Sequence, residues 1–408
     1  MSELSYLEKL LDGVEVEWLP LGEVSALRRG RVMSKGYLTE NFGPYPVYSS
    51  QTANNGKIGS INTFDFDGEY ISWTTDGANA GTMFYRTGKF SITNVCGLIT
   101  LKSKYSLIYK FLFYWLTIEA KKHVYSGMGN PKLMSHQVEN IPVPIPCPDN
   151  PEKSLAIQSE IVRILDTFSA LTAELTAELT AELNMRKKQY NYYRDQLLSF
   201  NTEDVPHLPM GQKDIGEFIR GGTFQKKDFI DAGVGCIHYG QIYTYYGTYT
   251  EKTKTYISTA LAKKCKKAQK GDLIIATTSE NDEDVCKAVA WLGSEDIAVS
   301  SDACIYKHNL NPKYVSYFFQ TEQFQNQKRQ YITGAKVRRV NADNLSKILI
   351  LVPSMEIQER IVSILDKFDT LTNSITEGLP REIELRQKQY EYYRDLLFSF
   401  PKPETASN

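Results

Sequence analysis

Two long segments of the 408-residue chain carry apolar residues at helical spacing. In the first segment these positions are Ile157, Ile161, Leu165, Phe168, Leu171, Leu175, Leu179, Leu183, Tyr190, Tyr193 and Leu197. In the second they are Ile361, Leu365, Phe368, Leu371, Leu379, Tyr390, Tyr393 and Leu397. This pattern predicts two long amphipathic helices. Two such stripes bury their apolar faces most simply against each other, so we expect an antiparallel pair.

The two helical segments are copies of one sequence. IQSEIVRILDTFSALTAEL from Ile157 matches IQERIVSILDKFDTLTNSI from Ile357, and RKKQYNYYRDQLLSF from Arg186 matches RQKQYEYYRDLLFSF from Arg386. Weaker matches upstream keep the same order and pair Gly127 with Gly334, Lys132 with Arg339, and LPLG at 19–22 with LPMG at 208–211. The chain is therefore internally duplicated, and pseudo-two-fold symmetry is expected.

The copies differ at one place. In the first copy TAELTAELTAEL runs from Thr172 to Leu183, whereas Gly378 and Pro380 interrupt the second copy opposite this run. Because Ala, Glu and Leu are strong helix formers, each TAEL is predicted to be a helical spacer, and a kink or break is predicted at Gly378. The spacer residues are Thr172, Leu175, Thr176, Leu179, Thr180 and Leu183. Replication slippage in a tolerant exposed helix is the alternative explanation of the repeat.

The remaining blocks read as two α+β domains of mixed topology, joined by the two long antiparallel helices. Short aromatic and β-branched runs punctuated by Gly and Asn predict strands, and each block closes with one amphipathic helix and a Gly-containing loop. The predicted division is an N-terminal segment 1–18, a first block 19–150, a helical spacer 151–200, a second block 201–356, and a second helical segment with the tail at 357–408.

Composition excludes several classes of protein. A net charge of -1 excludes binding to nucleic acid through bulk charge, so cations for such a partner must be segregated or come from another subunit. Six cysteines without a CxxC pair suggest reduced thiols rather than disulfides or a zinc site. The sequence shows neither a leader peptide nor a membrane-spanning run, so a soluble cytoplasmic protein is expected.

Catalytic motifs are not evident. NPKY at 311–314 and GNPKL at 129–133 fall short of the Asn/Asp-Pro-Pro-aromatic motif of amino-methyltransferases, and no Gly-rich cofactor loop lies between a strand and a helix. The five histidines lack metal-ligand spacing with carboxylates or cysteines. We therefore predict neither a catalytic residue nor a metal site nor a bound cofactor in this chain.

Cationic, amide and hydroxyl side chains do recur beside aromatics in both blocks. Arg and Lys can contact phosphates or guanine edges, and Asn and Gln match adenine edges. The candidate DNA-binding residues of the first block are Arg28, Arg29, Arg31, Lys35, Ser49, Ser50, Gln51, Asn54, Asn55, Lys57, Thr74, Thr75, Asn79, Asn130 and Lys132. Those of the second block are Arg220, Lys226, Lys227, Tyr239, Gln241, Tyr243, Thr277, Thr278, Ser279, Lys336, Arg338 and Arg339. The basic run EKTKTYISTALAKKCKKAQKG is explained by a solvated face or by phosphate contacts without sequence readout.

Four stretches together resemble the specificity subunits of type I restriction-modification enzymes, most closely the type IC group. They are SYLEKLLDGVEVEWLPLGE near the N-terminus, PIPCPDNPEKSLAIQSEIVRILD, the TAEL run with NMRKKQYNYYRDQLLSF, and ILDKFDTLTNSITEGLPREIELRQKQYEYYRDLLFSF near the C-terminus. The two blocks match the family only in pattern, which includes the Gly127 loop and its partner at Gly334.

The resemblance implies a non-catalytic subunit with two target-recognition domains, each reading one half of a bipartite asymmetric site on double-stranded DNA. It further implies that the repeated helices dock two modification subunits, which bring S-adenosylmethionine and methylate adenine N6. Two restriction subunits would join to give translocation and cleavage driven by ATP and magnesium, as part of bacterial defence.

The resemblance also gives the TAEL repeat a physical interpretation. One TAEL adds about 6 Å and about 40° to a helix, while one base pair adds about 3.4 Å and roughly 36° to a duplex. Copy number is therefore predicted to set the unspecified spacer between half-sites, at about one base pair per copy. A coiled-coil scaffold with two ligand-binding β-rich domains, and a single-chain enzyme, are the alternative interpretations of the whole chain.

Overall fold

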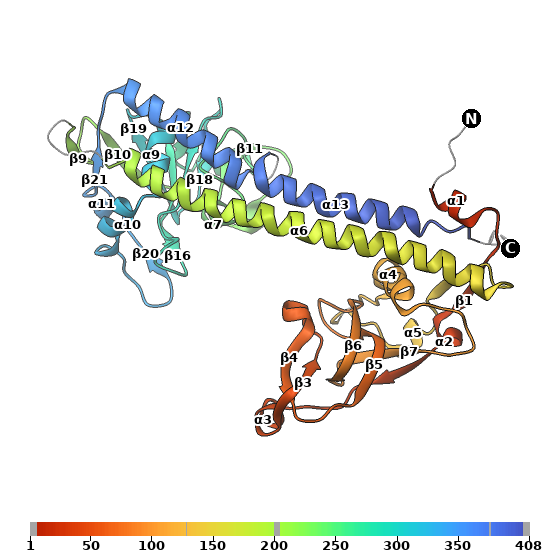
Figure 1. The fold of residues 1–408 in the computed structure, drawn as a ribbon. Coiled ribbons are helices and arrows are strands. Elements are labelled where there is room, and N and C mark those ends of the chain that lie inside the picture. The colour runs from red at the N-terminus through yellow and green to blue at the C-terminus, as the bar shows by residue number, and fades with distance from the viewer. Residues whose placement is uncertain (1–5, 128, 200–204, 375–376, 403–408) are drawn as a thin grey trace. The chain divides into compact units, whose positions relative to one another are not determined.

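The computed structural model describes residues 6–127, 129–199, 205–374 and 377–402. Some residues of the predicted segments lie outside the described residues. They are residues 1–5 of the N-terminal segment, Met128 of the Gly127 loop, Phe200, residues 201–204 of the second block and the end of the tail. The chain forms two compact units. Unit 1 comprises 1–176 and 385–408, and unit 2 comprises 177–384. Both divisions fall inside the long helices (Figure 1).

The first predicted helix is α6, which runs from Pro151 to Leu197 without interruption over 47 residues. Pro151 is its first residue, a position where a missing backbone N–H is tolerated. The TAEL run lies wholly inside α6, and the division between units follows Thr176 within that run. The four-residue repeat is thus a helical segment, as predicted.

The second helical segment is broken, also as predicted. Helix α12 spans Met355–Asn373 and helix α13 spans Gly378–Leu397. Gly378 has φ +76, and a Cβ atom there would lie 2.5 Å from the carbonyl oxygen of Thr370. Only glycine tolerates both the left-handed backbone and this close approach. Pro380 then sits in the first turn of α13, where the ring clashes with no preceding turn.

Each unit contains an antiparallel pair of these helical segments. In unit 1 the rings of Phe168 and Tyr393 lie 5.6 Å apart. In unit 2 the rings of Tyr193 and Phe368 lie 5.7 Å apart and stack. Phe168 corresponds to Phe368 and Tyr193 to Tyr393 in the duplicated sequence, so the same contact is made twice with the helices exchanged. The pseudo-two-fold repeat is confirmed at the level of individual side chains.

Unit 1 is built on a six-stranded sheet of order β2-β7-β5-β6-β3-β4, in which only the β3–β6 pair is parallel. A second, two-stranded sheet pairs β1 with β8. Besides α6 and α13, its elements are α1 (Tyr6–Leu11), β1 (Val16–Pro20), α2 (Leu21–Val24), β2 (Ser25–Arg29), α3 (Lys35–Glu40), β3 (Phe42–Tyr48), η1 (Ala53–Gly56), β4 (Lys57–Ile61), β5 (Phe66–Thr74), β6 (Met83–Ile92), β7 (Cys96–Leu101), α4 (Tyr109–Glu119), η2 (Ala120–His123), α5 (Ser135–Val138) and β8 (Pro142–Pro146).

Unit 2 has two main sheets, of order β10-β19-β15-β17-β12 and β13-β11-β18-β14, and two small ones, β16-β20 and β9-β21. Its elements besides the long helices are β9 (His207–Pro209), β10 (Gly216–Arg220), η3 (Lys226–Asp228), β11 (Val234–Ile237), α7 (Tyr239–Thr244), β12 (Tyr249–Thr250), β13 (Thr255–Ile257), α8 (Thr259–Ala262), β14 (Lys267–Ala268), β15 (Leu273–Ala276), β16 (Thr278–Ser279), β17 (Ala288–Trp291), β18 (Ile297–Val299), β19 (Ala303–His308), α9 (Pro312–Phe318), α10 (Glu322–Arg329), β20 (Arg338–Arg339), α11 (Ala342–Leu345) and β21 (Leu349–Leu351).

The two units share one strand order beneath these differences. The antiparallel series β2-β7-β5 corresponds to β10-β19-β15. The single long strand β6 of unit 1 is replaced in unit 2 by two strands, β17 and β18, which separates one sheet into two. The parallel pair β3–β6 then corresponds to β11–β18. Duplication therefore extends to the blocks, as the predicted similar topology requires.

Helices α4 and α9 are attached to α6 and α12 by the same hydrogen bonds in the two units. In unit 1 the Asp166 carboxylate accepts from Lys110 Nζ at 2.6 Å and from the Tyr114 hydroxyl at 2.7 Å. In unit 2 Asp366 accepts from Lys313 Nζ and from the Tyr317 hydroxyl, both at 2.7 Å. In each unit the Lys and the Tyr stand four residues apart, on α4 and on α9.

A buried glutamine adds a second repeated attachment. Gln158 Oε1 accepts the backbone N–H of Ile108 at 2.9 Å, and Gln358 Oε1 accepts that of Asn311 at 2.8 Å. Each of these N–H groups stands at the start of the helix that it precedes, α4 or α9. A helix N-terminus has backbone donors without intrahelical partners, so the glutamine satisfies one of them.

Replacing Asp366 with Asn is expected to destabilise unit 2 by about 2 kcal/mol, because it leaves the half-buried Lys313 ammonium without its counterion. Lys313 and Asp366 are only 20% and 27% exposed, whereas Lys110 and Asp166 are 37% and 38% exposed. Asp166→Asn, the matched control, is therefore expected to cost under about 1 kcal/mol. Urea unfolding of both variants measures this, and an equal or larger effect of Asp166→Asn would refute the burial argument.

One predicted helix of the second block is wrong. The segment from Lys313 to Gly334 was expected to form a single amphipathic helix, but it forms α9 and α10 with a break at 319–321. The buried Thr321 hydroxyl accepts the backbone N–H of Phe324 at 3.2 Å and caps α10. Capping by a threonine side chain starts a new helix where apolar periodicity alone predicts continuation.

Unit 2 also contains a half-buried histidine that makes its stability depend on pH. His308 Nδ1 accepts the N–H of Leu310 at 3.2 Å, and its buried Nε2 has no hydrogen-bond partner among the described residues. Burial lowers the pKa of His308 from 6.5 to about 4. The unfolded chain therefore takes up a proton first as the pH falls below 6.5, and stability is lost toward pH 4.

Lowering the pH from 7 to 5 is expected to remove about 2 kcal/mol of unfolding free energy through His308. His308→Asn keeps an acceptor for Leu310 but does not titrate, so this part of the pH dependence should disappear. Urea unfolding of both proteins at the two pH values measures the difference. An unchanged pH dependence in the variant would show that other groups are responsible.

Candidate nucleic-acid interface

In unit 1, predicted residues from three segments meet at the turn Thr93–Val95, between β6 and β7. Arg29, at the end of β2, donates from Nη1 to the carbonyl oxygen of Asn94 at 3.1 Å and to Thr75 Oγ1 at 3.1 Å. Thr75, which follows β5, donates from its N–H to the carbonyl oxygen of Val95 at 3.1 Å. The Thr93 hydroxyl hydrogen-bonds Ser49 Oγ at 2.9 Å, so the SSQTANNGK loop is attached to the same turn.

Unit 2 repeats this arrangement around the turn Ser300–Asp302, between β18 and β19. Arg220, at the end of β10, donates from Nε to the carbonyl oxygen of Ser301 at 3.0 Å. The N–H of Thr277 donates to the carbonyl oxygen of Asp302 at 3.0 Å. The N–H of Tyr239 donates to Ser300 Oγ at 2.9 Å. We call Thr93–Val95 and Ser300–Asp302 the hub turns, because each joins the strand-end arginine to two other predicted segments.

The glycine after each arginine allows the close approach to the hub turn. A Cβ atom at Gly30 would lie 2.2 Å from the carbonyl oxygen of Ile92, and one at Gly221 would lie 2.2 Å from that of Ser300. Such distances forbid any side chain, so an Arg-Gly pair is required in both units. The sequence pointed to Arg29 and Arg220 but not to these glycines, although each arginine is followed directly by glycine.

The Gly-containing loops bring Lys132 and Arg339 to the same place in their units. In unit 1 Lys132 forms a bridge to Tyr125, and the next residue, Leu133, donates its N–H to the carbonyl oxygen of Thr75 at 2.9 Å. In unit 2 Arg339 pairs with Thr333 and Thr278, and Val340 donates to the carbonyl oxygen of Thr277 at 3.1 Å.

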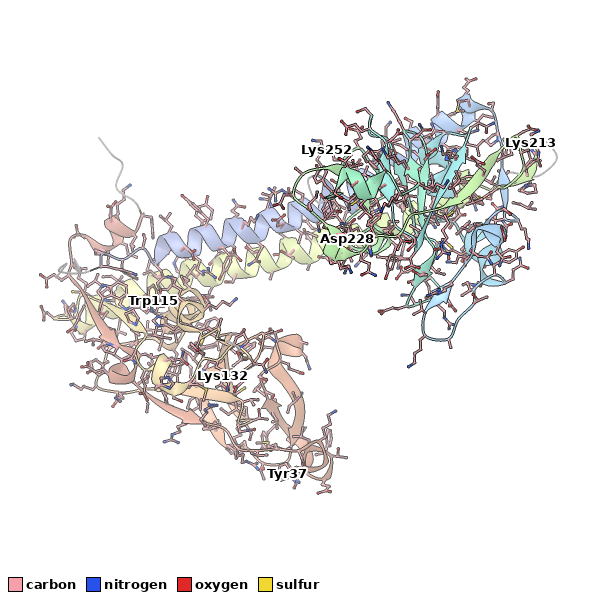
Figure 2. The ribbon with its side chains drawn as sticks, turned by 180° about the vertical axis from the view of Figure 1, so that it is seen from behind. Tyr37, Trp115, Lys132, Lys213, Asp228 and Lys252 are labelled. Atoms are coloured by element: carbon pink, nitrogen blue, oxygen red, sulfur yellow. The ribbon has the colours of Figure 1, made fainter. Side chains whose placement is uncertain are left out.

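The two cations are therefore held on equivalent backbones, as the weak sequence match suggested. Both Lys132 and Arg339 are exposed, and neither side chain has a polar partner within the part of the chain that the structure describes. In the view of Figure 2, Lys132 lies between Trp115, on α4, and Tyr37, on α3. Both cations are therefore available to an outside ligand.

Some predicted contact residues are buried and hold the structure around the hub turns instead. Thr74 and Thr75 are fully buried, and Thr75 Oγ1 donates to the carbonyl oxygen of Val95 at 2.9 Å. Gln241 is buried as well, since its Oε1 accepts the N–H of His238 at 2.9 Å. Thr278 is likewise buried, and its carbonyl oxygen accepts the Tyr243 hydroxyl at 2.7 Å. Direct contact of the Thr75 or Gln241 side chain with a ligand would require it to leave these partners.

Two further arginines are held by carboxylates. Arg31 Nε lies 3.0 Å from Asp65 Oδ2, and Arg338 Nε lies 2.7 Å from Asp282 Oδ1. Hydrogen bonds to the Tyr37 hydroxyl and to Asp65 raise the pKa of Arg31. Because each guanidinium already has a counterion, these two arginines are less available to a phosphate than Lys132 or Arg339.

The structure leaves the other predicted residues at the surface without tying their side chains to a hub turn. Exposed among them are Arg28, Lys35, Gln51, Asn54, Asn55, Asn130, Lys226, Lys227 and Lys336. Half-buried are Ser50, Lys57, Asn79 and Ser279. Gln51 Nε2 donates to the carbonyl oxygen of Lys57 at 2.7 Å, which closes the loop that both residues belong to.

Arg86 is a buried cation that sequence reasoning missed. It is 3% exposed, its Nε donates to Ser72 Oγ at 3.0 Å, and its guanidinium lies 3.6 Å from the ring centroid of Tyr48. Burial lowers the pKa of Arg86 to about 10. A Cβ atom at Gly56 would lie 3.1 Å from Arg86 Nη2, so the guanidinium packs against the SSQTANNGK loop at Gly56. In the sequence, Arg86 is an ordinary strand residue between Tyr85 and Thr87, so nothing there indicates that it is buried under the loop.

Other site types find no support within the described residues. Nowhere in these ranges do three or more His, Cys, Asp or Glu side chains gather so that a metal ion could be held. The six cysteines are free thiols. Across the described helices, none combines the length and apolar character needed to cross a membrane.

Comparison with known proteins gives one family. The family model described as type I restriction modification DNA specificity domain matches residues 13–185 and again residues 209–385. Each match covers one block with the helical segment that follows it, which reproduces the internal duplication.

Characterised relatives agree over the full length. The Escherichia coli EcoR124I/EcoR124II specificity subunit is 40% identical over 100% of both chains. The Escherichia coli EcoprrI specificity subunit is 36% identical over 92% of this chain and 93% of its own. A chain solved in a study of complex assembly and conformational transition of the type I R-M system shares the fold, with a TM-score of 0.64 over 94% of this chain and 98% of that one, at 13% identity.

Proposed function

Because this chain belongs to the type I restriction modification DNA specificity family, and is a specificity subunit, we propose that it reads a bipartite asymmetric DNA target. Unit 1 reads one half and unit 2 the other. The repeated hub turns are the observation that carries this proposal, since the same backbone arrangement presents different side chains in the two units. Lys132 in one unit and Arg339 in the other are the clearest example.

The readers act through cations and polar groups that surround the hub turns. Arginine and lysine contact guanine edges and phosphates, and amides match adenine edges. Arg29 and Arg220 orient the hub turns, while Lys132, Arg339 and the exposed amides of Gln51, Asn54 and Asn55 contact the duplex. Different side chains on one backbone make the two half-sites different, so the target is asymmetric.

The helical segments dock two copies of the modification subunit. Tyr192 on α6 is 61% exposed and its counterpart Tyr392 on α13 is 65% exposed, so an aromatic surface recurs once in each unit. Exposed aromatics are enriched at protein interfaces. Two equivalent surfaces suit two identical partners. These partners supply S-adenosylmethionine and adenine N6 methylation, and two restriction subunits supply translocation and cleavage driven by ATP and magnesium.

The chain itself carries out no chemistry under this proposal, and it acts in the cytoplasm with the bacterial chromosome. A scaffold with two ligand-binding β-rich domains is the rival. A selection experiment separates the two proposals. The chain, alone and co-assembled with its modification subunits, is incubated with a pool of random duplexes, and the retained DNA is sequenced. The proposal expects the assembled complex to enrich two short motifs at a fixed distance. A complex that retains DNA without any enriched motif would contradict it.

A further inference from the structure

Unit 2 contains an insertion that unit 1 lacks. In unit 1 only residues 62–65 connect β4 to β5, whereas in unit 2 residues 258–272 connect the corresponding strands β13 and β15. The insertion holds α8 and β14, and it carries the lysines Lys263, Lys264, Lys266, Lys267 and Lys270. We call Lys263, Lys264, Lys266 and Lys267 the lysine ridge.

The inserted backbone is fixed to the unit rather than loosely attached. Ala262 and Ala268 are buried, and Ala262 packs in one apolar cluster with Phe224 and Ile257. Lys267 in β14 pairs with Ala298 in β18. Burial of the alanines on one side leaves the lysines on the other, so the ridge projects from a rigid base.

The positive charge of the ridge is not compensated locally. All four lysines are exposed, and none of their ammonium groups has an ion pair or hydrogen bond in the described parts of the chain. The one carboxylate of the insertion, Asp272, is buried and accepts the N–H of Gln269 at 2.8 Å. Four adjacent like charges repel each other, so an anionic ligand that spans them gains from all of them.

The ridge adjoins the interface already described. A Cβ atom at Gly222 would lie 2.6 Å from Cα of Cys265, so the backbone between Lys264 and Lys266 touches the Gly221–Gly222 segment. Gly222 is two residues from Arg220, a span of at most about 7 Å. Gly222 also bridges Ser300 of the hub turn. The lysines therefore flank the reader of unit 2 directly.

We propose that the lysine ridge binds the phosphate backbone of the duplex and anchors unit 2 to DNA without reading its sequence. This proposal rests on the proposed function, and it adds an asymmetry between the two units. Lysine ammonium groups act as point charges toward phosphates and do not discriminate bases. The phosphate backbone of a duplex is a polyanion that can contact several neighbouring lysines at once. Unit 2 thereby has a sequence-independent contact that unit 1 lacks, because unit 1 has no counterpart of the insertion.

The test measures the salt dependence of DNA binding by the chain assembled with its modification subunits. The two probes are a duplex carrying the target motif found by methylation mapping and a duplex with both half-sites scrambled. Each phosphate contact adds about 0.9 to the slope of log K against log salt concentration. Lys264→Gln/Lys266→Gln is expected to make the slope less steep by about 2 on both duplexes while the methylated motif stays the same.

Two variants control the experiment. Lys213→Gln/Lys347→Gln removes the same charge from exposed lysines elsewhere in unit 2. Lys252 precedes the insertion, and Figure 2 shows Lys213 on the opposite side of unit 2 from Lys252. This variant is expected to keep the wild-type slope. Lys264→Arg/Lys266→Arg keeps the charge and is expected to restore the slope.

An unchanged slope for Lys264→Gln/Lys266→Gln on both duplexes would overturn the proposal. Impaired assembly with the modification subunits at an unchanged slope would also overturn it and assign the lysines to a protein contact. Failure of the wild-type complex to distinguish the two duplexes would instead count against the proposed function. The scrambled duplex still tests the ridge in that case, because phosphate contacts do not depend on sequence.

Discussion

Deleting Thr180–Leu183, one copy of TAEL, is expected to abolish methylation of the parental target and to create methylation of the same two half-sites with a spacer one base pair shorter. The reason is geometric. Removing four residues shortens a helix by about 6 Å and rotates its far end by about 40°, and the rotation nearly equals the roughly 36° of one base pair. Bending of the duplex or of the helices absorbs the remaining translation.

The measurement is adenine methylation mapped across a genome that carries the variant with its modification subunits. Inserting a fourth TAEL after Leu183 is the opposite change and should lengthen the spacer by one base pair. Glu174→Gln/Glu178→Gln alters the repeat without changing its length, so it should keep the parental spacer. A spacer that stays constant in the deletion and insertion variants would defeat the ruler interpretation of α6.

Lys132→Ala and Arg339→Ala are each expected to damage the reading of one half-site and to leave the other half intact. Both side chains are exposed, on equivalent backbones next to the hub turns, and have no polar partner in the described residues. Loss of a good base contact costs about 1 to 3 kcal/mol, so methylation at the parental target should fall roughly 10- to 100-fold and one position should become degenerate.

The unaffected half-site is the internal control in this experiment, because a general loss of folding or assembly would weaken both halves equally. Methylation mapping of the two variants gives the readout. If Lys132→Ala and Arg339→Ala relaxed positions in the same half-site, the assignment of one unit to each half would be wrong. If neither changed the motif, these cations would be phosphate contacts rather than base readers.

The long helices could be predicted from sequence because their signals are local. Apolar periodicity predicted α6, and the glycine and proline pair predicted the break before α13. The identity between the copies explains why the Phe168–Tyr393 and Tyr193–Phe368 contacts are symmetric. The failed prediction was local as well. Thr321 caps α10, and a buried capping threonine cannot be told from an ordinary one by periodicity.

The hub turns could not be predicted, because main-chain hydrogen bonds between distant residues build them. Thr75 meets Val95 and Leu133 in unit 1, and Thr277 meets Asp302 and Val340 in unit 2. Loops of different length shift the numbering between the units, so the equivalent residues do not align in a simple comparison. Side chains there vary while the backbone contacts repeat, which leaves little sequence similarity to detect.

The attachment of α4 to α6 and of α9 to α12 could not be predicted from the sequence either. Lys110 and Tyr114 bind Asp166 as Lys313 and Tyr317 bind Asp366. A Lys and a Tyr four residues apart are too common in helices to be noticed in one sequence. Their meaning comes only from the carboxylate that receives both, which lies 49 to 56 residues away in the chain.

The most direct test of two readers on one chain is the map of adenine methylation in a genome that carries this subunit with its modification partners. Two unlike half-sites separated by a gap of fixed length, with any base tolerated inside the gap, are the predicted result. A single uninterrupted motif, or two halves whose separation varies from site to site, would contradict the account.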